Sequence, residues 1–183
     1  GHDVVREPEL VRGSLGYLSA STGPYARLSP RETLDYFGRL HGMSRALLKS
    51  RIPELLSLFG MEEFADIRCE KLSTGMKQKV SIARAILHDP PVLILDEPTL
   101  GLDILVASVM MRFIAGARAQ GKCIVFSTHI MSEVEKLCDR VAIIHRGTVR
   151  ALGTLAELRA QTGKIQMDEV FLSLVDAVEP GHA

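Results

Sequence analysis

The sequence predicts an α/β fold, in which a mostly parallel sheet carries an inserted block of helices. Two short apolar runs, residues 92–95 and 123–126, have the length and composition of buried strands. Segments with helical periodicity precede and follow each run, and this alternation is typical of parallel sheets. A strand-like piece lies earlier in the chain, at residues 15–18. The segment between it and these runs shows only helical periodicity, as is expected of an inserted helical subdomain.

Composition limits the classes of protein to consider. The 183 residues are 46% hydrophobic and 24% charged, enough for one domain with a real core. The formal net charge of zero argues against a nucleic-acid-binding footprint spread over the whole surface, though not against a local patch. The longest apolar run, residues 104–111, is too short to cross a bilayer, and the first residues do not resemble a signal peptide.

The cysteines and histidines point to neither a disulfide framework nor a metal centre. Three cysteines are an odd number without a CxxC pair, so we predict reduced thiols in a cytosolic protein, two of them buried. The six histidines lack ligand spacing, so we expect no zinc site.

The helical block has clear boundaries. Ser29-Pro30-Arg31-Glu32 is a capping box with proline at the first helical position, and it predicts a helix over residues 30–41 that ends at Gly42. A second helix is expected over residues 45–59, closed by Gly60.

The remaining elements follow from turn and periodicity signals. A helix begins at Leu72-Ser73-Thr74-Gly75 and is stopped by Asp89-Pro90-Pro91. After the strand at 92–95, we expect these elements in order: helix 104–120 ended by Gly121, strand 123–126, helix 132–137, strand 141–144, a hairpin turn at 146–148, strand 149–152, and one or two short helices in the tail from residue 154. The buried face of these tail helices would consist of Val170, Phe171, Leu174 and Val175.

Two adjacent carboxylates, Asp96 and Glu97, follow the apolar strand directly. Pro98 cannot continue a central strand, so the pair lies at the carboxyl end of that strand, where open α/β sheets bind ligands. An acidic pair there suits a magnesium site with a water-activating base for phosphoryl transfer. A strand that simply ends in a solvated acidic turn is the alternative.

Two further features fit the same edge of the sheet. His129 follows the neighbouring strand, so it lies on the same rim and could donate to a phosphate oxygen, although a plain surface or capping histidine fits too. Ser73 and Gly75 open a helix, where free amides, the helix dipole and a hydroxyl form an anion site. An ordinary N-cap is the alternative for this pair.

Taken in order, these segments resemble the ATP-binding-cassette (ABC) ATPases over nearly the whole chain. Residues 72–76 look like the LSGGQ signature, residues 92–97 like the Walker B strand with its catalytic glutamate, and residues 100–103 like the D-loop. His129 resembles the switch histidine, and the helical block the inserted α-helical subdomain. The ending, with Arg146-Gly147 and residues 169–172, resembles the bacterial exporter branch that handles sodium or drugs.

The resemblance implies a role for each site residue. Asp96 would hold Mg²⁺ through water, Glu97 would polarise the attacking water, and His129 would contact the γ-phosphate of ATP. Because family members dimerise head to tail, Ser73 and Gly75 would touch ATP bound to the other subunit of a homo- or heterodimer. Asp103 would couple the two sites.

The sequence departs from the family at the phosphate loop, because G-x-x-x-x-G-K-[ST] is absent. Gly116, Gly121 and Lys122 have the right spacing, but the segment runs from helix into strand and ends in Cys123. The opening residues 1–4 resemble the strand-and-turn that follows the loop's helix. We therefore expect an amino-terminally truncated cassette that hydrolyses essentially no ATP alone; a chain that evolved without the loop is the alternative.

Two milder departures concern other motifs. The Q-loop glutamine should fall near Ala20, yet the first glutamine in the chain is Gln78. Thr74 and Met76 replace the glycine and glutamine of the signature, while Ser73 and Gly75 are retained.

The resemblance therefore predicts a partial ABC nucleotide-binding domain over residues 1–183. Its parts would be a helical subdomain at about 28–75, the rest of the catalytic core at about 76–153 and a C-terminal extension at about 154–183. It would act at the inner face of the cell membrane, with an integral membrane permease docked on residues 30–60 and the loop before them. A non-catalytic partner subunit, or an ABC ATPase acting on ribosomes or DNA, are the alternatives.

Overall fold

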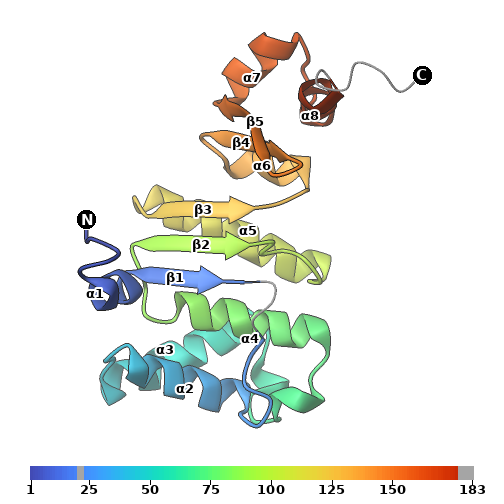
Figure 1. Cartoon of the computed structure of the whole chain (residues 1–183). Helices are drawn as coiled ribbons and strands as arrows, with labels where there is room; N and C mark the ends of the chain where they lie inside the picture. Colours follow the sequence, from blue (N-terminus) through green and yellow to red (C-terminus); the bar gives the residue numbers. More distant parts are fainter. Residues whose placement is uncertain (20–22, 177–183) are drawn as a thin grey trace. The chain divides into compact units, whose positions relative to one another are not determined.

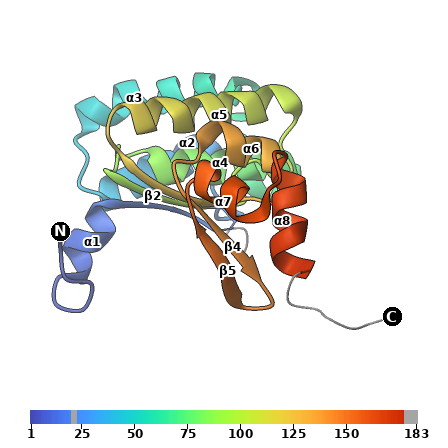
Figure 2. The same ribbon diagram turned by 90° about the horizontal axis from the view of Figure 1, so that it is seen from above.

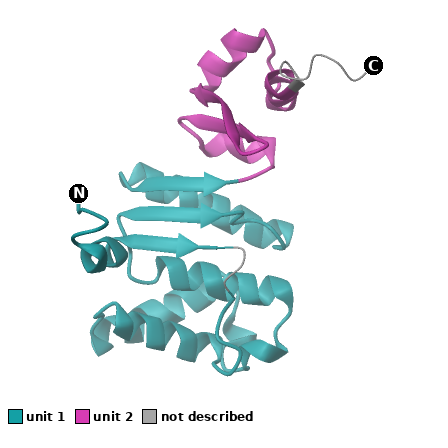
Figure 3. Ribbon diagram, viewed as in Figure 1, with its two compact units in different colours: residues 1–127 teal, residues 128–183 magenta. Residues whose placement is uncertain are grey.

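The structure, a computed structural model, describes residues 1–19 and 23–176. The chain forms two compact units, residues 1–127 and 128–183 (Figure 3). Among the described residues, no helix combines the length and apolar character needed to cross a membrane. The position expected for the Q-loop glutamine, Ala20, lies outside the described residues.

A three-stranded parallel sheet forms the centre of the first unit (Figure 1). Its strands, in spatial order, are β1 (Leu15–Leu18), β2 (Val92–Asp96) and β3 (Cys123–Ser127). The three predicted strands are thereby confirmed, and their neighbours and direction are those of an α/β sheet. The register aligns the carboxyl ends of β2 and β3.

Two helices cover one face of this sheet. α4 (Thr74–Ile86) and α5 (Ile104–Ala119) lie on the same side of the strands (Figure 2). Leu18, Leu93 and Leu95, which lie on the face toward these helices, are fully buried. Gly16 of β1 lies against the carbonyl of Ala85 in α4, where a Cβ would have no room. The helix therefore packs directly on the strand backbone.

Side chains on the opposite face of the sheet are exposed. Tyr17, Ile94 and Val125 pair in one row across it and are 54%, 38% and 59% exposed. The prediction that residues 123–126 form a buried strand is therefore wrong in its burial, although the strand exists. β3 has a single neighbour among the described strands, and every second residue of it, Cys123, Val125 and Ser127, is exposed.

The prediction that two of the cysteines are buried is also wrong, since β3 is exposed at Cys123. Cys69 is buried, Cys138 is half-buried and Cys123, on β3, is exposed. All three are free thiols, as predicted.

The helical block packs against α4. It comprises α2 (Pro30–Leu40), α3 (Arg45–Leu58) and two 3₁₀ turns, Glu62–Phe64 and Cys69–Lys71. The predicted capping box is confirmed: the Ser29 hydroxyl accepts from the Glu32 amide at 3.2 Å, and the Glu32 carboxylate accepts from the Ser29 amide at 2.8 Å. Gly42 and Gly60 follow the two helices with positive φ.

The first residues differ from the prediction. Residues 1–7 contain a turn and no strand, and a short helix, α1 (Pro8–Gly13), follows. No residue of α1 is buried, so the sequence carries no apolar period that would have revealed it.

The second unit is a hairpin with three helices. β4 (Val141–His145) and β5 (Thr148–Gly153) are antiparallel, and Arg146 and Gly147 take the positive φ of the predicted turn. The helices are α6 (Met131–Leu137), α7 (Leu155–Thr162) and α8 (Met167–Asp176). Val170 and Leu174 are buried in the unit's core, with Phe171 and Val175 packed at its margin, which confirms the predicted buried face of the tail.

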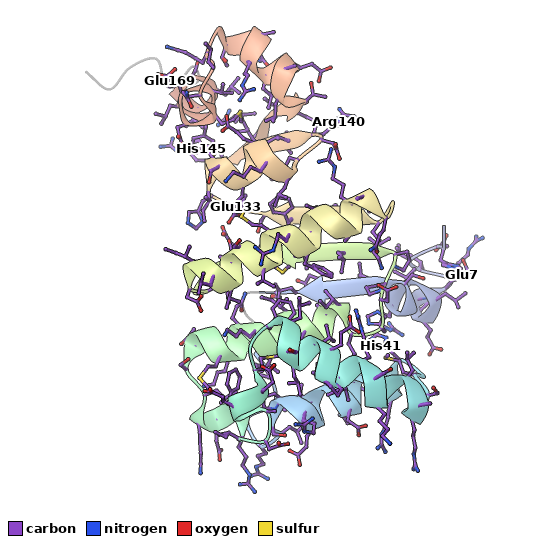
Figure 4. The ribbon with its side chains drawn as sticks, turned by 180° about the vertical axis from the view of Figure 1, so that it is seen from behind. Glu7, His41, Glu133, Arg140, His145 and Glu169 are labelled. Carbon is purple, nitrogen blue, oxygen red and sulfur yellow. The ribbon has the colours of Figure 1, made fainter. Side chains whose placement is uncertain are left out.

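Two imidazole rings stack where the ends of α2 and α4 meet. The centroids of His41, labelled in Figure 4, and His88 are 3.6 Å apart, and the rings are nearly parallel. Burial and, secondarily, the His41 ring lower the pKa of His88 from 6.5 to about 4, and burial lowers the pKa of His41. Both shifts favour the neutral ring.

This stack makes stability depend on pH. Between about pH 6.5 and 4, the unfolded chain binds a proton at position 88 that the folded chain does not, so the free energy of unfolding should fall as pH falls through that window. Between pH 7 and pH 5, the free energy of unfolding of His88→Gln should fall by about 1–2 kcal/mol less than that of the unmodified chain. This difference is smaller than the full pKa shift would give, because the ring is only partly buried. Urea unfolding at pH 7 and pH 5 measures it.

The matched control is His145→Gln, which changes a histidine on β4 and leaves the stack intact. That variant should keep the pH dependence of the original chain. An equal dependence in His88→Gln and the unmodified chain would contradict the prediction.

Candidate functional site

The acidic pair lies where β2 leaves the sheet. Asp96 is the last residue of β2 and pairs in register with Ser127, the last residue of β3. The Ser127 hydroxyl donates to Oδ1 of Asp96 at 2.7 Å and accepts from the Glu97 amide at 2.9 Å. One hydroxyl thus connects the side chain of the first acidic residue to the backbone of the second.

Glu97 turns the chain out of the sheet through an unusual backbone conformation. Its φ is +47°, in the left-handed region that residues other than glycine, asparagine and aspartate rarely adopt. The Leu100 amide donates to the Glu97 carbonyl at 3.1 Å and closes the turn, and Pro98 and Thr99 are buried beneath it. Strain of this kind persists where surrounding contacts hold it, and it is concentrated at functional sites.

These carboxylates fit a magnesium ion. No group of three or more His, Cys, Asp or Glu side chains in the described part of the chain could hold a metal by itself. Mg²⁺, however, is held typically by one or two carboxylates together with water and substrate phosphates, and it does not require a protein cage. The two carboxylates at the end of β2 satisfy that requirement.

The signature-like segment lies next to the turn that follows the acidic pair. Ser73 caps α4, with its hydroxyl accepting from the Met76 amide at 3.3 Å. A Cβ on Gly75 would lie 2.8 Å from the Gly101 carbonyl, so the two backbones touch there. The structure therefore brings the start of α4 against the loop between β2 and α5.

Asp103 ends that loop and caps α5. Its Oδ1 accepts from the Val106 amide at 3.0 Å, and this hydrogen bond, with a smaller contribution from Lys79, lowers the pKa of the carboxyl. The carboxylate is exposed at the positive end of the helix. The N-cap is a structural role for Asp103; coupling across a dimer stays a prediction.

His129 belongs to the second unit, two residues beyond the end of β3, and is exposed. The Thr128 hydroxyl beside it donates to the buried carboxylate of Glu133, labelled in Figure 4, at 2.8 Å and accepts from the Ile130 amide at 3.0 Å. These bonds hold the backbone on both sides of His129 in a defined turn at the start of α6.

The segment with phosphate-loop spacing has a structural role instead. It runs from α5 into β3, as predicted. Lys122 donates to the Asp89 carboxylate at 2.6 Å and to the Pro90 carbonyl at 2.9 Å, and so ties the start of β3 to the chain that follows α4. Its ammonium group is engaged there.

Ser127 is the residue of this site that the sequence analysis did not single out. The signal was weak: a serine that follows a strand is common, and its importance depends on the register that aligns it with Asp96.

Comparison with known proteins identifies the family. The family model described as ABC transporter matches residues 1–100. NatA, an ABC transporter ATP-binding protein of Bacillus subtilis, is 42% identical over 174 residues, which cover 94% of this chain and 71% of the relative. The Bacillus subtilis ABC-type transporter ATP-binding protein EcsA is 36% identical and is covered to 74%. The Nod factor export ATP-binding protein I of a Rhizobium species is also 36% identical, but this chain spans only 56% of it.

Solved structures agree. The ATP-binding subunit of an ABC transporter superposes with a TM-score of 0.87 at 36% identity, over 96% of this chain and 74% of that one. An ATP-binding cassette solved as a dimer with ADP and Pi has the same fold, with a TM-score of 0.73 at 24% identity. These findings confirm the resemblance and the partial nucleotide-binding fold drawn from the sequence. The chain belongs to the ABC transporter ATP-binding proteins.

Proposed function

We propose that this chain is the ATP-binding and ATP-hydrolysing part of an ABC export system, and that Asp96 and Glu97 are the centre of its site. The observation that carries the proposal is the left-handed turn at Glu97, anchored by Ser127 directly beside the carboxylate of Asp96. Asp96 would hold Mg²⁺ through water, and the ion would neutralise phosphate charge when bound.

Each remaining site residue has a defined task in this proposal. The Glu97 carboxylate takes a proton from the water that attacks the γ-phosphorus, while the bond to the β-phosphate oxygen breaks and ADP leaves. His129 donates a hydrogen bond to a γ-phosphate oxygen and stabilises the charge that develops there. Ser73 and the amide of Gly75 contact the γ-phosphate bound to a second subunit, and Asp103 couples the two sites.

The phosphate loop would come from a strand and a helix preceding residue 1 in a longer protein. Two observations support this. Parallel sheets are covered on both faces, but one face of β1–β3 presents Tyr17, Ile94 and Val125 to solvent. The relatives NatA and EcsA also extend beyond the part that this chain matches.

Chain topology suggests where such a strand would pair. The steps from β1 to β2 and from β2 to β3 run in one direction across the sheet, and their helices cover one face, as right-handed crossovers require. A helix on the opposite face must therefore connect two strands in the reverse direction across the sheet, from the β3 side toward β1. The strand before it would pair with the edge of β3 that has no partner among the described strands, and would lead back to β1.

We expect the 183-residue chain alone to hydrolyse essentially no ATP. Fusing the strand, phosphate loop and helix of NatA before residue 1 should restore turnover, because the loop supplies most phosphate contacts. In that fusion, Glu97→Gln should reduce kcat by about 10²–10⁴-fold. Steady-state phosphate release measures both.

The matched control for this fusion is Glu63→Gln, which changes an exposed glutamate of the helical block and should leave kcat unaltered. Turnover by the unfused chain that disappears on Glu97→Gln would refute the requirement for an added loop. A fusion that binds ATP yet never hydrolyses it would favour the alternative, a non-catalytic subunit that lends Ser73 and Gly75 to another cassette.

An exposed aromatic cluster is our candidate surface for the membrane permease. Tyr25 lies in the loop before α2, with its ring 5.9 Å from Tyr36 and 5.8 Å from Phe37. The two tyrosines are 54% and 44% exposed, and Leu40, one turn after Tyr36, is 63% exposed. Arg84 lies over the Phe37 ring at 5.0 Å and supports the cluster from α4. Exposed tyrosines are typical anchors of protein interfaces.

This surface predicts how permease binding responds to mutation. Tyr36→Ser should weaken co-purification with the integral membrane permease of the proposed export system by about tenfold, since interface tyrosines commonly contribute more than 1 kcal/mol. Ile67→Ser, at an equally exposed residue that lies after residues 30–60, should not. Equal recovery of the membrane protein with both variants would reject the cluster as the docking surface and leave the ATP site unaffected. Such docking would hold the subunit at the inner face of the membrane.

A further inference from the structure

We propose that Ser127 is a positioning residue, whose hydroxyl fixes both the carboxylate of Asp96 and the backbone of Glu97 in their working arrangement. The inference rests on the proposed function, because it assigns Ser127 a role in the same site. Ser127 itself need not touch ATP.

The hydroxyl uses both of its hydrogen-bonding functions. It donates its single proton to Oδ1 of Asp96 at 2.7 Å, and its oxygen accepts from the Glu97 amide at 2.9 Å. Because the one proton is committed to Asp96, the lone pairs of the oxygen are directed to the amide. A bond to an ionised carboxylate is stronger than one between neutral groups. The pair of bonds therefore fixes the rotation of the Asp96 carboxylate as well as the position of the amide.

The sheet register makes this position specific. Asp96 and Ser127 are the last paired residues of β2 and β3, and both lie on the face of the sheet that carries Ile94 and Val125. The Glu97 amide follows directly after the last residue of β2 and donates to the Ser127 hydroxyl. A side-chain oxygen at position 127 therefore holds this amide where β2 ends and the chain leaves the sheet.

The backbone of Glu97 explains why such an anchor is needed. A glutamate with φ of +47° is held in a sparsely populated conformation that costs about 1–3 kcal/mol. Ser127 holds the amide of Glu97, and the Leu100 amide holds its carbonyl at 3.1 Å. Without the hydroxyl, one side of this turn loses its restraint, and Glu97 can relax to ordinary backbone angles. Its carboxylate would then leave the place from which it acts.

Amide hydrogen exchange of the 183-residue chain, followed by NMR, tests this without requiring turnover. Ser127→Ala should raise the exchange rate of the Glu97 amide about tenfold. Ser127→Thr keeps the hydroxyl and should restore the rate to within about twofold of the original. Ser50→Ala, which removes an exposed hydroxyl bonded within α3, is the control and should change neither rate nor melting temperature.

Mn²⁺, used in place of Mg²⁺, gives a second readout that a purely structural serine would not alter. Paramagnetic broadening of the Asp96 and Glu97 amide signals should require about 10–100-fold more Mn²⁺ in Ser127→Ala than in the original chain, and Ser127→Thr should reverse this. An unchanged Glu97 exchange rate in a folded Ser127→Ala chain would overturn the proposal. Faster exchange, with Mn²⁺ broadening insensitive to Asp96→Asn, would support the positioning role and count against the metal assignment of the proposed function.

Discussion

The parallel pairing of β2 with β3 is the constraint on which the site depends. Their register ends both strands at one level, so Asp96 and Ser127 are paired at the edge of the sheet. Burial of Leu93 and Leu95 beneath α5 and α4 fixes that register, because a shift of one residue would turn these side chains to the open face. The core of the first unit therefore determines which polar groups meet at its edge.

The N-termini of two helices also contribute polar groups to this site. Ser73 and Asp103 cap α4 and α5, and the contact of Gly75 with the Gly101 carbonyl brings the loop between β2 and α5 against the first turn of α4. Amides at helix N-termini attract anions, and carboxylates attract the metal ion that accompanies a nucleotide phosphate. Opposite kinds of charge are thus offered by two segments of backbone that touch at Gly75 and Gly101, which suits the binding of a metal–nucleotide complex.

The exposed face of the sheet agrees with a partial nucleotide-binding fold. Apolar side chains there remain in water, and each 100 Å² of such surface forgoes about 2.5 kcal/mol of burial free energy. Exposed edges and faces of this kind are sites where sheets gain partners or aggregate. In the proposed function, a helix over that face would cover the apolar row and begin beside the acidic pair.

The sequence by itself determined the family and the local elements other than α1. Pro98, the capping box at Ser29 and the glycines that follow α2, α3, α5 and α7 set element ends through backbone geometry, which needs no tertiary partner. Motif order then identified the cassette. Only the tertiary structure decided the role of Ser127, the contact of Gly75 with Gly101 and the exposure of Cys123. These depend on strand register and on which faces are covered, and residues far apart in the chain fix both.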